Sequence, residues 1–406
     1  DGFPSLGGWS QDGDVHSATL YYGSDGEYTF AMGFTDMAGN TADDVAEQDF
    51  IIDQTDPELT ITGVEDQAAY NGTITPDISC SDTNMDASGF QVTLEKDGEE
   101  VSYDKAVLQD GMEFAYSDFA DTKDADGIYT LKASATDRAD RTVEKTVTFS
   151  VNRYGSNYLI ADDVKNILGK YVKDNIDVVI SEVNVDDLAM NTIKVVLTKN
   201  GTPETLTEGK DYTLDKTGGN GRWCEYTYTI GKQKFESDGT YIVTLYSVDK
   251  AGNINQSADE NKAAEVSFGI DHTDPEVVAM DIEDGGIYPV DSKEVTASVT
   301  DNLVLDHVSI LVNGEEVNYD KDGDNYTFLV NNSTEMQSVR VIATDAADNT
   351  KVYDVNNVLV TSNLWIRFIH NRMAVILVIT GVVCLCAIVA GSVVVIRSKK
   401  KKKEEM

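Results

Sequence analysis

One five-residue motif recurs along this chain, and its spacing limits what the chain can fold into. The copies are Asp36-Met-Ala-Gly-Asn40, Asp137-Arg-Ala-Asp-Arg141, Asp249-Lys-Ala-Gly-Asn253 and Asp345-Ala-Ala-Asp-Asn349. The steps between their first aspartates are 101, 112 and 96 residues. A step of about 100 residues is the length of one small β-sandwich domain. The spacing therefore predicts related units arranged in tandem.

The residues before each motif alternate between apolar and polar, which is typical of a strand with one buried face. In the first three copies the alternation starts at a tyrosine eight residues before the motif aspartate, in Gly26-Glu-Tyr28, Gly127-Ile-Tyr129 and Gly239-Thr-Tyr241. The fourth copy lacks the Gly-x-Tyr but keeps Val339, Val341 and Ala343 in phase. A strand is expected at the same place in every copy.

Turn and stop signals divide the chain at regular intervals. Hairpin turns are predicted at Lys96-Asp-Gly98, Lys199-Asn-Gly201 and Val312-Asn-Gly314, because Asp-Gly and Asn-Gly suit the positive φ angles of tight turns. Thr55-Asp-Pro57 and Thr273-Asp-Pro275 follow two of the last strands and mark stops, since proline lacks an amide donor. Short strands with frequent turn residues favour β-sandwiches over βαβ units.

These signals predict an all-β chain of tandem sandwiches. The expected boundaries are a partial domain 1–53, then domains 54–152, 153–271 and 272–360. The domain 153–271 carries insertions, and its segment 158–172 has apolar spacing that suits a short helix or a structured linker.

A single apolar segment near the C-terminus predicts a membrane-spanning helix. Residues 373–396 contain no charged side chain, and 24 residues at about 1.5 Å each exceed a hydrocarbon core of about 30 Å. A juxtamembrane linker, 361–372, precedes the segment, and a basic tail, 397–406, follows it. A buried core helix is the alternative, but soluble helices of this length keep a polar face.

Charge predicts the orientation of that helix. The chain carries a net charge of −39, yet residues 364–406 carry +6 and the residues before them −45. The positive-inside rule then places the tail in the cytoplasm and the acidic part outside the cell. Strong acidity also excludes binding to nucleic-acid phosphates. Because the first residues show no export signal, we expect the chain to be the C-terminal part of a longer protein.

The repeated motif, the Gly-x-Tyr strand before it and the exit Phe50-Ile-Ile-Asp53 before Thr-Asp-Pro together resemble the bacterial immunoglobulin-like (Big) repeats of large surface proteins. The resemblance covers roughly residues 10–360; the second and fourth copies depart from it within the motif, at Asp140-Arg141 and Ala347-Asp348. The C-terminal segment is similar to those of membrane-held surface proteins of clostridia-like Gram-positive bacteria. This resemblance implies immunoglobulin-like sandwiches, an extracellular structural or adhesive role, and no catalytic residues.

Acidic residues around the predicted linkers suggest calcium sites. The candidate ligands are Asp36, Asp53, Asp56, Asp249, Asp271 and Asp274. Carboxylate oxygens are the ligands that calcium prefers, and six to eight of them are needed. A solvated acidic surface is the alternative to calcium. For the motif itself a turn is favoured over a ligand site, because aspartate accepts backbone amides and Gly-Asn supplies left-handed residues.

The sequence leaves several functions open. The first hypothesis is a non-catalytic stalk that is anchored in the cell membrane by residues 373–396. The second is an adhesin module that binds a cell-wall or host glycan or a host protein; Trp223 is its candidate contact because it falls outside the alternation that predicts burial of Tyr226 and Tyr228. The third is the spacer of a larger surface enzyme.

Overall fold

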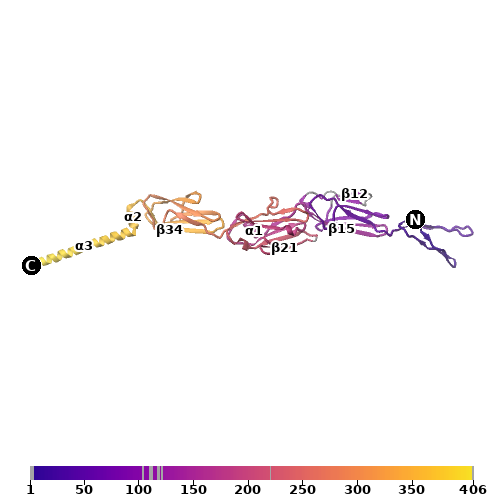
Figure 1. Ribbon diagram of the computed structural model, residues 1–406, viewed down its shortest axis with the longest axis horizontal. Helices are drawn as coiled ribbons and strands as arrows, with labels where there is room; N and C mark the ends of the chain where they lie inside the picture. Colours follow the sequence, from indigo (N-terminus) through magenta and orange to yellow (C-terminus); the bar gives the residue numbers. More distant parts are fainter. Residues whose placement is uncertain are drawn as a thin grey trace.

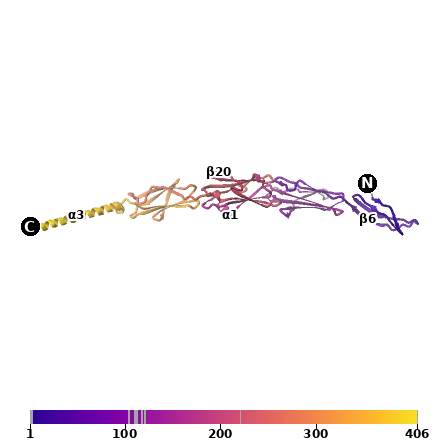
Figure 2. The same ribbon diagram turned by 60° about the horizontal axis from the view of Figure 1, so that its bottom comes forward.

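The computed structural model describes residues 4–102, 105–108, 113–116, 119, 122–219 and 221–404. The first three residues of the predicted domain 1–53 and the last two of the predicted tail lie outside this range. Figures 1 and 2 show an elongated molecule, in which the β-sheets follow one another in a line from the N-terminal hairpins to a C-terminal helix. We call the copies of the motif and the strands around them the first to fourth repeats.

The second repeat is a sandwich of two antiparallel sheets. One sheet has the order β12-β13-β9-β7, and the other has the order β11-β10-β14-β15-β8. Their bounds are β7 Glu58–Thr62, β8 Ala69–Tyr70, β9 Asp77–Ser81, β10 Met85–Lys96, β11 Glu99–Glu100, β12 Lys105–Leu108, β13 Glu113–Tyr116, β14 Gly127–Asp137 and β15 Thr142–Val151. If the strands other than β8 and β11 are lettered A to G along the chain, the first sheet is A-B-E-D and the second is C-F-G, as in an immunoglobulin fold. Strand β8 is added in parallel beside β15.

The third and fourth repeats have the same strand order. In the third, β16-β18-β22-β21 faces β17-β25-β23-β19-β20; in the fourth, β26-β28-β32-β31 faces β27-β34-β33-β29-β30. The bounds in the third repeat are β16 Asn157–Ile160, β17 Tyr171–Val172, β18 Val178–Asn184, β19 Lys194–Lys199, β20 Thr202–Thr205, β21 Tyr212–Thr217, β22 Cys224–Ile230, β23 Gly239–Val248, β24 Ile254–Gln256 and β25 Val266–Ile270. Those in the fourth are β26 Glu276–Met280, β27 Ile287–Tyr288, β28 Ser292–Thr300, β29 Leu305–Val312, β30 Glu315–Glu316, β31 Tyr319–Asp322, β32 Asn325–Asn331, β33 Gln337–Asp345 and β34 Thr350–Val360. The all-β immunoglobulin-like class predicted from the sequence is confirmed.

Helical segments are short within the repeats. The segment 158–172, where we expected a short helix or a structured linker, contains α1, Asp162–Ile167, between two strands. The single-turn segments are η1 Lys123–Ala125, η2 Met190–Thr192 and η3 Lys232–Phe235.

The first repeat contributes its last hairpin and a few shorter strands. The hairpin pairs β5, Gly26–Met32, with β6, Val45–Ile52, and corresponds to β14 and β15 of the next repeat. The shorter strands are β1 Ser5–Leu6, β2 Ser10–Asp12, β3 Val15–Ser17 and β4 Leu20–Tyr21. Most of their side chains are exposed because no second sheet covers them within the described residues.

Each complete repeat has its own hydrophobic core. The alternating residues of β14 are buried between the sheets, as the period of two predicts. Strands β23 and β33 show the same alternation. The three cores draw on both sheets of their repeat, with Ile78 and Leu131 in the second repeat as examples. Each repeat therefore buries its own apolar surface.

The Gly-x-Tyr tyrosine joins the core to the chain that leads into its strand. Tyr129 stacks on Phe149 of β15, with ring centroids 5.6 Å apart. Its hydroxyl donates to the backbone oxygen of Ala125, 2.6 Å away and four residues upstream. Tyr241 makes the equivalent bond to Ser237. This is the tyrosine corner of immunoglobulin-like sandwiches.

Two helices close the chain after the fourth repeat. Helix α2, Leu364–His370, begins at Asn363, whose side chain accepts the backbone N–H of Trp365. Helix α3, Arg372–Glu404, contains the predicted span 373–396, and its part Arg372–Lys401 is long and apolar enough to cross a membrane. None of the apolar stretch is covered by other parts of the described chain, as expected for a helix whose surroundings are lipid.

Candidate metal sites at the joints between repeats

The topology brings three chain segments together wherever one repeat follows another. The first residue after the last strand of a repeat lies at the joint. The next repeat contributes the residue at or just after its second long strand, and the aspartate that begins its copy of the motif. The three positions are Asp53, Asp82 and Asp137 at the first joint, Asn152, Asn184 and Asp249 at the middle joint, and Asp271, Asp301 and Asp345 at the last joint.

The motif itself is a turn. In the second repeat, Asp137 Oδ1 accepts the backbone N–H groups of Ala139 and Arg141, at 2.8 and 2.9 Å. The fourth motif residue has a positive φ in every copy: 87° at Gly39, 64° at Asp140, 89° at Gly252 and 67° at Asp348. Glycine and aspartate both tolerate this backbone region, so the departures from Gly preserve the turn. The backbone of the turn uses Oδ1 of the aspartate. Oδ2 accepts the side-chain amide of the motif asparagine in the first, third and fourth copies, whereas Oδ2 of Asp137 has no hydrogen-bond partner in the described chain.

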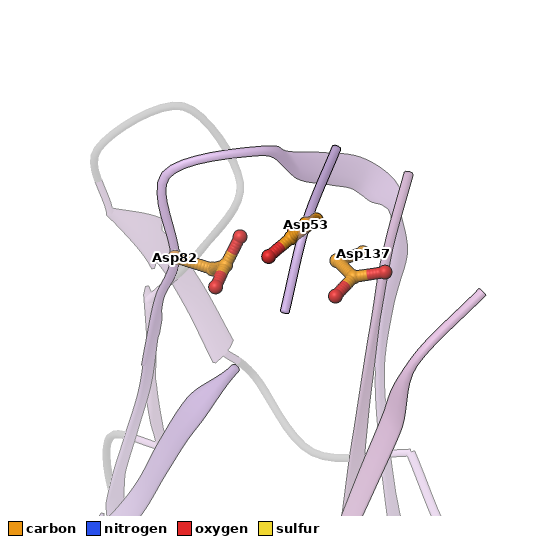
Figure 3. A group of neighbouring side chains, drawn as sticks. All are labelled: Asp53, Asp82 and Asp137. Carbon is orange, nitrogen blue, oxygen red and sulfur yellow. The ribbon is translucent and has the colours of Figure 1, made fainter. Parts of the chain in front are cut away.

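At the first joint three carboxylates converge (Figure 3). One oxygen from each of Asp53, Asp82 and Asp137 lies within 4.8 Å of the others. Asp53 and Asp82 use their Oδ1 atoms to accept backbone N–H groups two residues further on, from Thr55 and Asn84. Among the described residues, Oδ2 of Asp53 and Oδ2 of Asp137 are buried without a hydrogen-bond partner. Asp137 is only 3% exposed, so water does not compensate for the missing partner.

The last joint repeats this arrangement. Oxygens of Asp271, Asp301 and Asp345 lie within 4.8 Å of one another. Asp271 is 1% exposed, and Oδ2 of Asp271 and of Asp301 are buried with no hydrogen-bond partner in the described chain. Burial raises the pKa of Asp271, and the negative charges of Asp301 and Asp345 raise it further. Two such charges repel by roughly 3 kcal/mol at this separation with an effective dielectric constant of about 20.

The middle joint has amides where the other joints have carboxylates. Asp249 Oδ2 accepts hydrogen bonds from the side-chain amides of Asn152, at 3.0 Å, and Asn184, at 3.2 Å. Asn152 also donates to Asn184 Oδ1 at 2.8 Å. Asn253 adds a further bond to Asp249 Oδ2, at 3.0 Å. The three joint positions are therefore held together directly, by hydrogen bonds.

A second acidic residue fixes the linker after each of the first three repeats. It directly precedes the Gly-x-Tyr sequence. Asp238 accepts the backbone N–H of His272 at 3.0 Å and the hydroxyl of Thr273 at 2.5 Å. Asp25 holds Gln54 and Thr55 in the same way, and Asp126 accepts the backbone N–H groups of Arg153 and Tyr154. This clamp sets the direction in which the chain leaves each repeat.

The structure separates the six predicted calcium ligands. Asp53 and Asp271 lie in the two carboxylate clusters, and Asp249 lies in the hydrogen-bonded middle joint. Asp36 is exposed and lies at the opposite end of the β5–β6 hairpin from Asp53. Asp56 forms an ion pair with Arg141, 2.7 Å away, and Asp274 is exposed.

Four cluster residues were not predicted from the sequence. They are Asp82, Asp137, Asp301 and Asp345. A signal for two of them exists, since an Asp or Asn stands about 30 residues after each linker Asp or Asn. Proximity along the chain places each motif aspartate near the linker that follows its own repeat. The turn between the last two long strands instead faces the preceding repeat.

Trp223, the candidate contact for a glycan, lies between repeats. It is half-buried, and its indole N–H donates to Oδ1 of Asp97 in the second repeat at 2.9 Å. Tyr226 and Tyr228 are buried in the core of the third repeat. Trp223 thus takes part in the contact between the second and third repeats.

Comparison with known proteins gives structural likeness only. A scan against protein-family models and a search of curated proteins find no match for this chain. Among solved structures, the match to the I-band fragment I67–I69 of titin covers 76% of this chain and 99% of the titin fragment, with 12% identity and a TM-score of 0.32. The tetra-tandem repeat in the extending region of a large adhesion protein covers 86% and 89%, with 16% identity and a TM-score of 0.35. The N-terminal eight immunoglobulin domains of Down syndrome cell adhesion molecule cover 88% and 43%, with 11% identity and a TM-score of 0.36. With TM-scores below 0.5, these likenesses carry no argument about function.

Proposed function

We propose that this chain is a non-catalytic stalk of a bacterial surface protein. It is built from repeats of the bacterial immunoglobulin-like (Big) type and is anchored in the cell membrane by residues 373–396. The acidic repeats stand outside the cell, and the basic tail lies in the cytoplasm. The stalk holds its first repeat away from the membrane.

One observation carries this proposal. The repeats follow one another in a line, and the apolar helix α3 leaves the far end of that line (Figure 1). Each complete repeat has its own core, so each resists unfolding separately. The charge difference between the repeats and the tail supports the orientation.

The alternative of an adhesin module has less support. Its candidate contact, Trp223, is engaged by Asp97 of the neighbouring repeat. Its neighbours Tyr226 and Tyr228 fill the core, so these three aromatic side chains form no exposed patch. These three aromatic side chains therefore give no support to a binding site for a glycan or a host protein.

The orientation can be tested by protease protection. The full chain is expressed in bacteria behind an export signal, with an epitope added after Met406. Protease added to intact cells should remove the repeats and leave the epitope on a fragment of helix and tail. In permeabilised cells, the epitope should be lost as well. Loss of the epitope from intact cells, with the repeats protected, would reverse the proposed topology.

A further inference from the structure

We propose that the first and last joints each bind one calcium ion, and that the middle joint replaces the ion with the side-chain amides of Asn152 and Asn184. The ligands are Asp53, Asp82 and Asp137 at one site, and Asp271, Asp301 and Asp345 at the other. Backbone carbonyls and water would complete the coordination.

The unpartnered oxygens are the first reason. At each outer joint, two carboxylate oxygens are buried among the described residues without a hydrogen bond, and in Asp137 and Asp271 the whole side chain is almost fully buried. In Figure 3, the carboxylates of the first joint point toward a common space. No ion pair in the described part of the chain reaches any of the six carboxylates. Buried carboxylates need a positive partner or a metal.

The middle joint is the second and independent reason. Its chain path and its two turns match those of the outer joints, yet two of its three acids are amides. Asn184 Oδ1 accepts the backbone N–H of Asp186 two residues on, just as Asp82 Oδ1 accepts that of Asn84. The amide nitrogens of Asn152 and Asn184 then donate to Asp249 Oδ2. Amide hydrogens from two of the three positions therefore occupy the centre of this joint, whereas all three positions present carboxylate oxygens at the outer joints. At the last joint the motif residue Asn349 donates to Asp345 Oδ2 at 2.7 Å, as Asn253 does to Asp249 Oδ2 at the middle joint.

The ligand chemistry favours calcium. All six side chains supply hard oxygen atoms, and neither cluster contains a histidine or a cysteine. Oxygens that face each other across a calcium ion stand up to about 5 Å apart, because calcium–oxygen bonds are about 2.4 Å. The cluster oxygens lie within 4.8 Å of one another. Magnesium keeps several waters and binds through one or two carboxylates, so three converging carboxylates suit calcium better.

Binding would join two repeats at each outer joint. Asp53 belongs to the linker after β6, whereas Asp82 and Asp137 belong to the second repeat. The last joint is built in the same way, with Asp271 after β25 and its two partners in the fourth repeat. An ion held by all three would fix the angle between the repeats, while the middle joint is fixed without it.

The number of bound ions tests the proposal. The full chain in detergent micelles is freed of metal and titrated with CaCl₂ by isothermal calorimetry. The wild-type chain should bind two calcium ions, with dissociation constants of about 1 mM or tighter. Asp82→Asn and Asp301→Asn should each remove one ion, and the double variant should bind none at that concentration. MgCl₂ should bind at least tenfold more weakly than CaCl₂.

Matched variants control for folding and for general acidity. Asp82→Asn and Asp301→Asn copy the residue that the middle joint already has at this position, so the turn is retained. Circular dichroism in the absence of calcium checks that these variants fold. Asp36→Asn changes the motif aspartate of the first repeat, which is exposed and belongs to neither cluster, and should leave two ions bound.

The reverse exchange tests whether a calcium site can be added, again by the number of bound ions. Asn152→Asp combined with Asn184→Asp should create a third calcium site in the middle joint. A wild-type chain that binds no calcium at a few millimolar would overturn the proposal. Binding that persists unchanged in the folded Asp82→Asn, Asp301→Asn double variant would overturn it equally, because the ions would then lie elsewhere. A double exchange in the middle joint that leaves the count at two would contradict the role given to the amides.

Discussion

At the scale of single residues, the tyrosine before each of the first three motifs has two functions. Its ring lies flat against a phenylalanine of the next strand, and its hydroxyl reaches the backbone four residues upstream. In the fourth repeat, Gln337 takes the place of tyrosine, pairs with Val358 and donates to the backbone oxygen of Asn331. The position keeps a buried polar group that ties the strand to its entry loop, even though the ring is lost.

Removing that hydroxyl should weaken one repeat selectively. Tyr129→Phe keeps the stacked ring but leaves the backbone oxygen of Ala125 without its buried donor. We expect the free energy of unfolding of the second repeat to fall by about 1–2 kcal/mol. Hydrogen exchange resolved by mass spectrometry measures this repeat by repeat. Tyr28→Phe, at the half-buried equivalent in the first repeat, should have a smaller effect, and equal losses at both sites would refute this assignment.

At the scale of elements, the last residue of the motif differs between the second and fourth repeats, and its side chain makes a different contact across the joint in each case. Where the other copies end the motif with asparagine, the second repeat has Arg141, which bonds to Asp56 of the linker. In the fourth repeat, Asn349 donates instead to the backbone oxygen of Asp271. Both side chains reach across the joint. The turn therefore has one conserved backbone conformation and a variable contact to the preceding repeat.

The hydrogen bonds that Asp238 accepts from the linker should make the stability of the third repeat depend on pH. Burial opposes ionisation of Asp238, but hydrogen bonds from Thr273, His272 and Asn302 outweigh it and lower its pKa from 3.8 to about 2. A carboxylate with a depressed pKa in the folded state stabilises that state above its unfolded pKa, and the contribution is lost as pH falls through the folded value. This stabilisation should be complete at neutral pH and disappear between about pH 4 and pH 2.

The variant Asp238→Asn isolates this contribution. We expect it to be less stable than the wild type at pH 7, with a difference that shrinks as the pH falls toward 2. Urea unfolding followed by tryptophan fluorescence at several pH values measures the difference. Asp274→Asn, in the exposed part of the same linker, should show no such trend. A constant difference between Asp238→Asn and wild type at all pH values would rule the clamp out as its source.

At the scale of the whole molecule, the joints decide whether separate sandwiches act as one rod. The middle joint is closed by direct hydrogen bonds, by Trp223 on Asp97, and by Lys262, which donates to the backbone oxygens of Tyr154 and Ser156. The outer joints concentrate negative charge instead. A stalk with this arrangement would keep its central pair of repeats rigid while the stiffness of its two ends depends on calcium.

Chelation should therefore act on two joints and spare the third. With excess EGTA, limited proteolysis of the full chain should cut near Thr55 and Thr273, because the linkers lose their anchors. The middle joint, around residues 152–156, should stay protected. Millimolar calcium should suppress the two outer cuts. Cleavage that is equal with and without calcium, or that begins at the middle joint, would contradict this division of the stalk.

Part of the candidate site could be predicted from the sequence. Asp53 and Asp271 stand at recognisable stops before Thr-x-Pro, and their chemistry suggests calcium directly. Asp82 and Asp301 repeat at a spacing of about 30 residues from the linker aspartate, but spacing alone does not show that they meet it, and Asp137 lies further still from Asp53. Convergence over such distances depends on which strands pair and in which direction each turn faces.

The sequence by itself determined the strands, the turns and the membrane helix. These follow from local rules: side chains alternate along a strand, Asn-Gly and Asp-Gly adopt positive φ, and an uncharged segment of 24 residues matches the thickness of a bilayer. Only the tertiary structure decided which acids meet and where Trp223 lies. The reason is that a sandwich folds its motif turn back toward the preceding repeat, so residues distant in the chain share one joint.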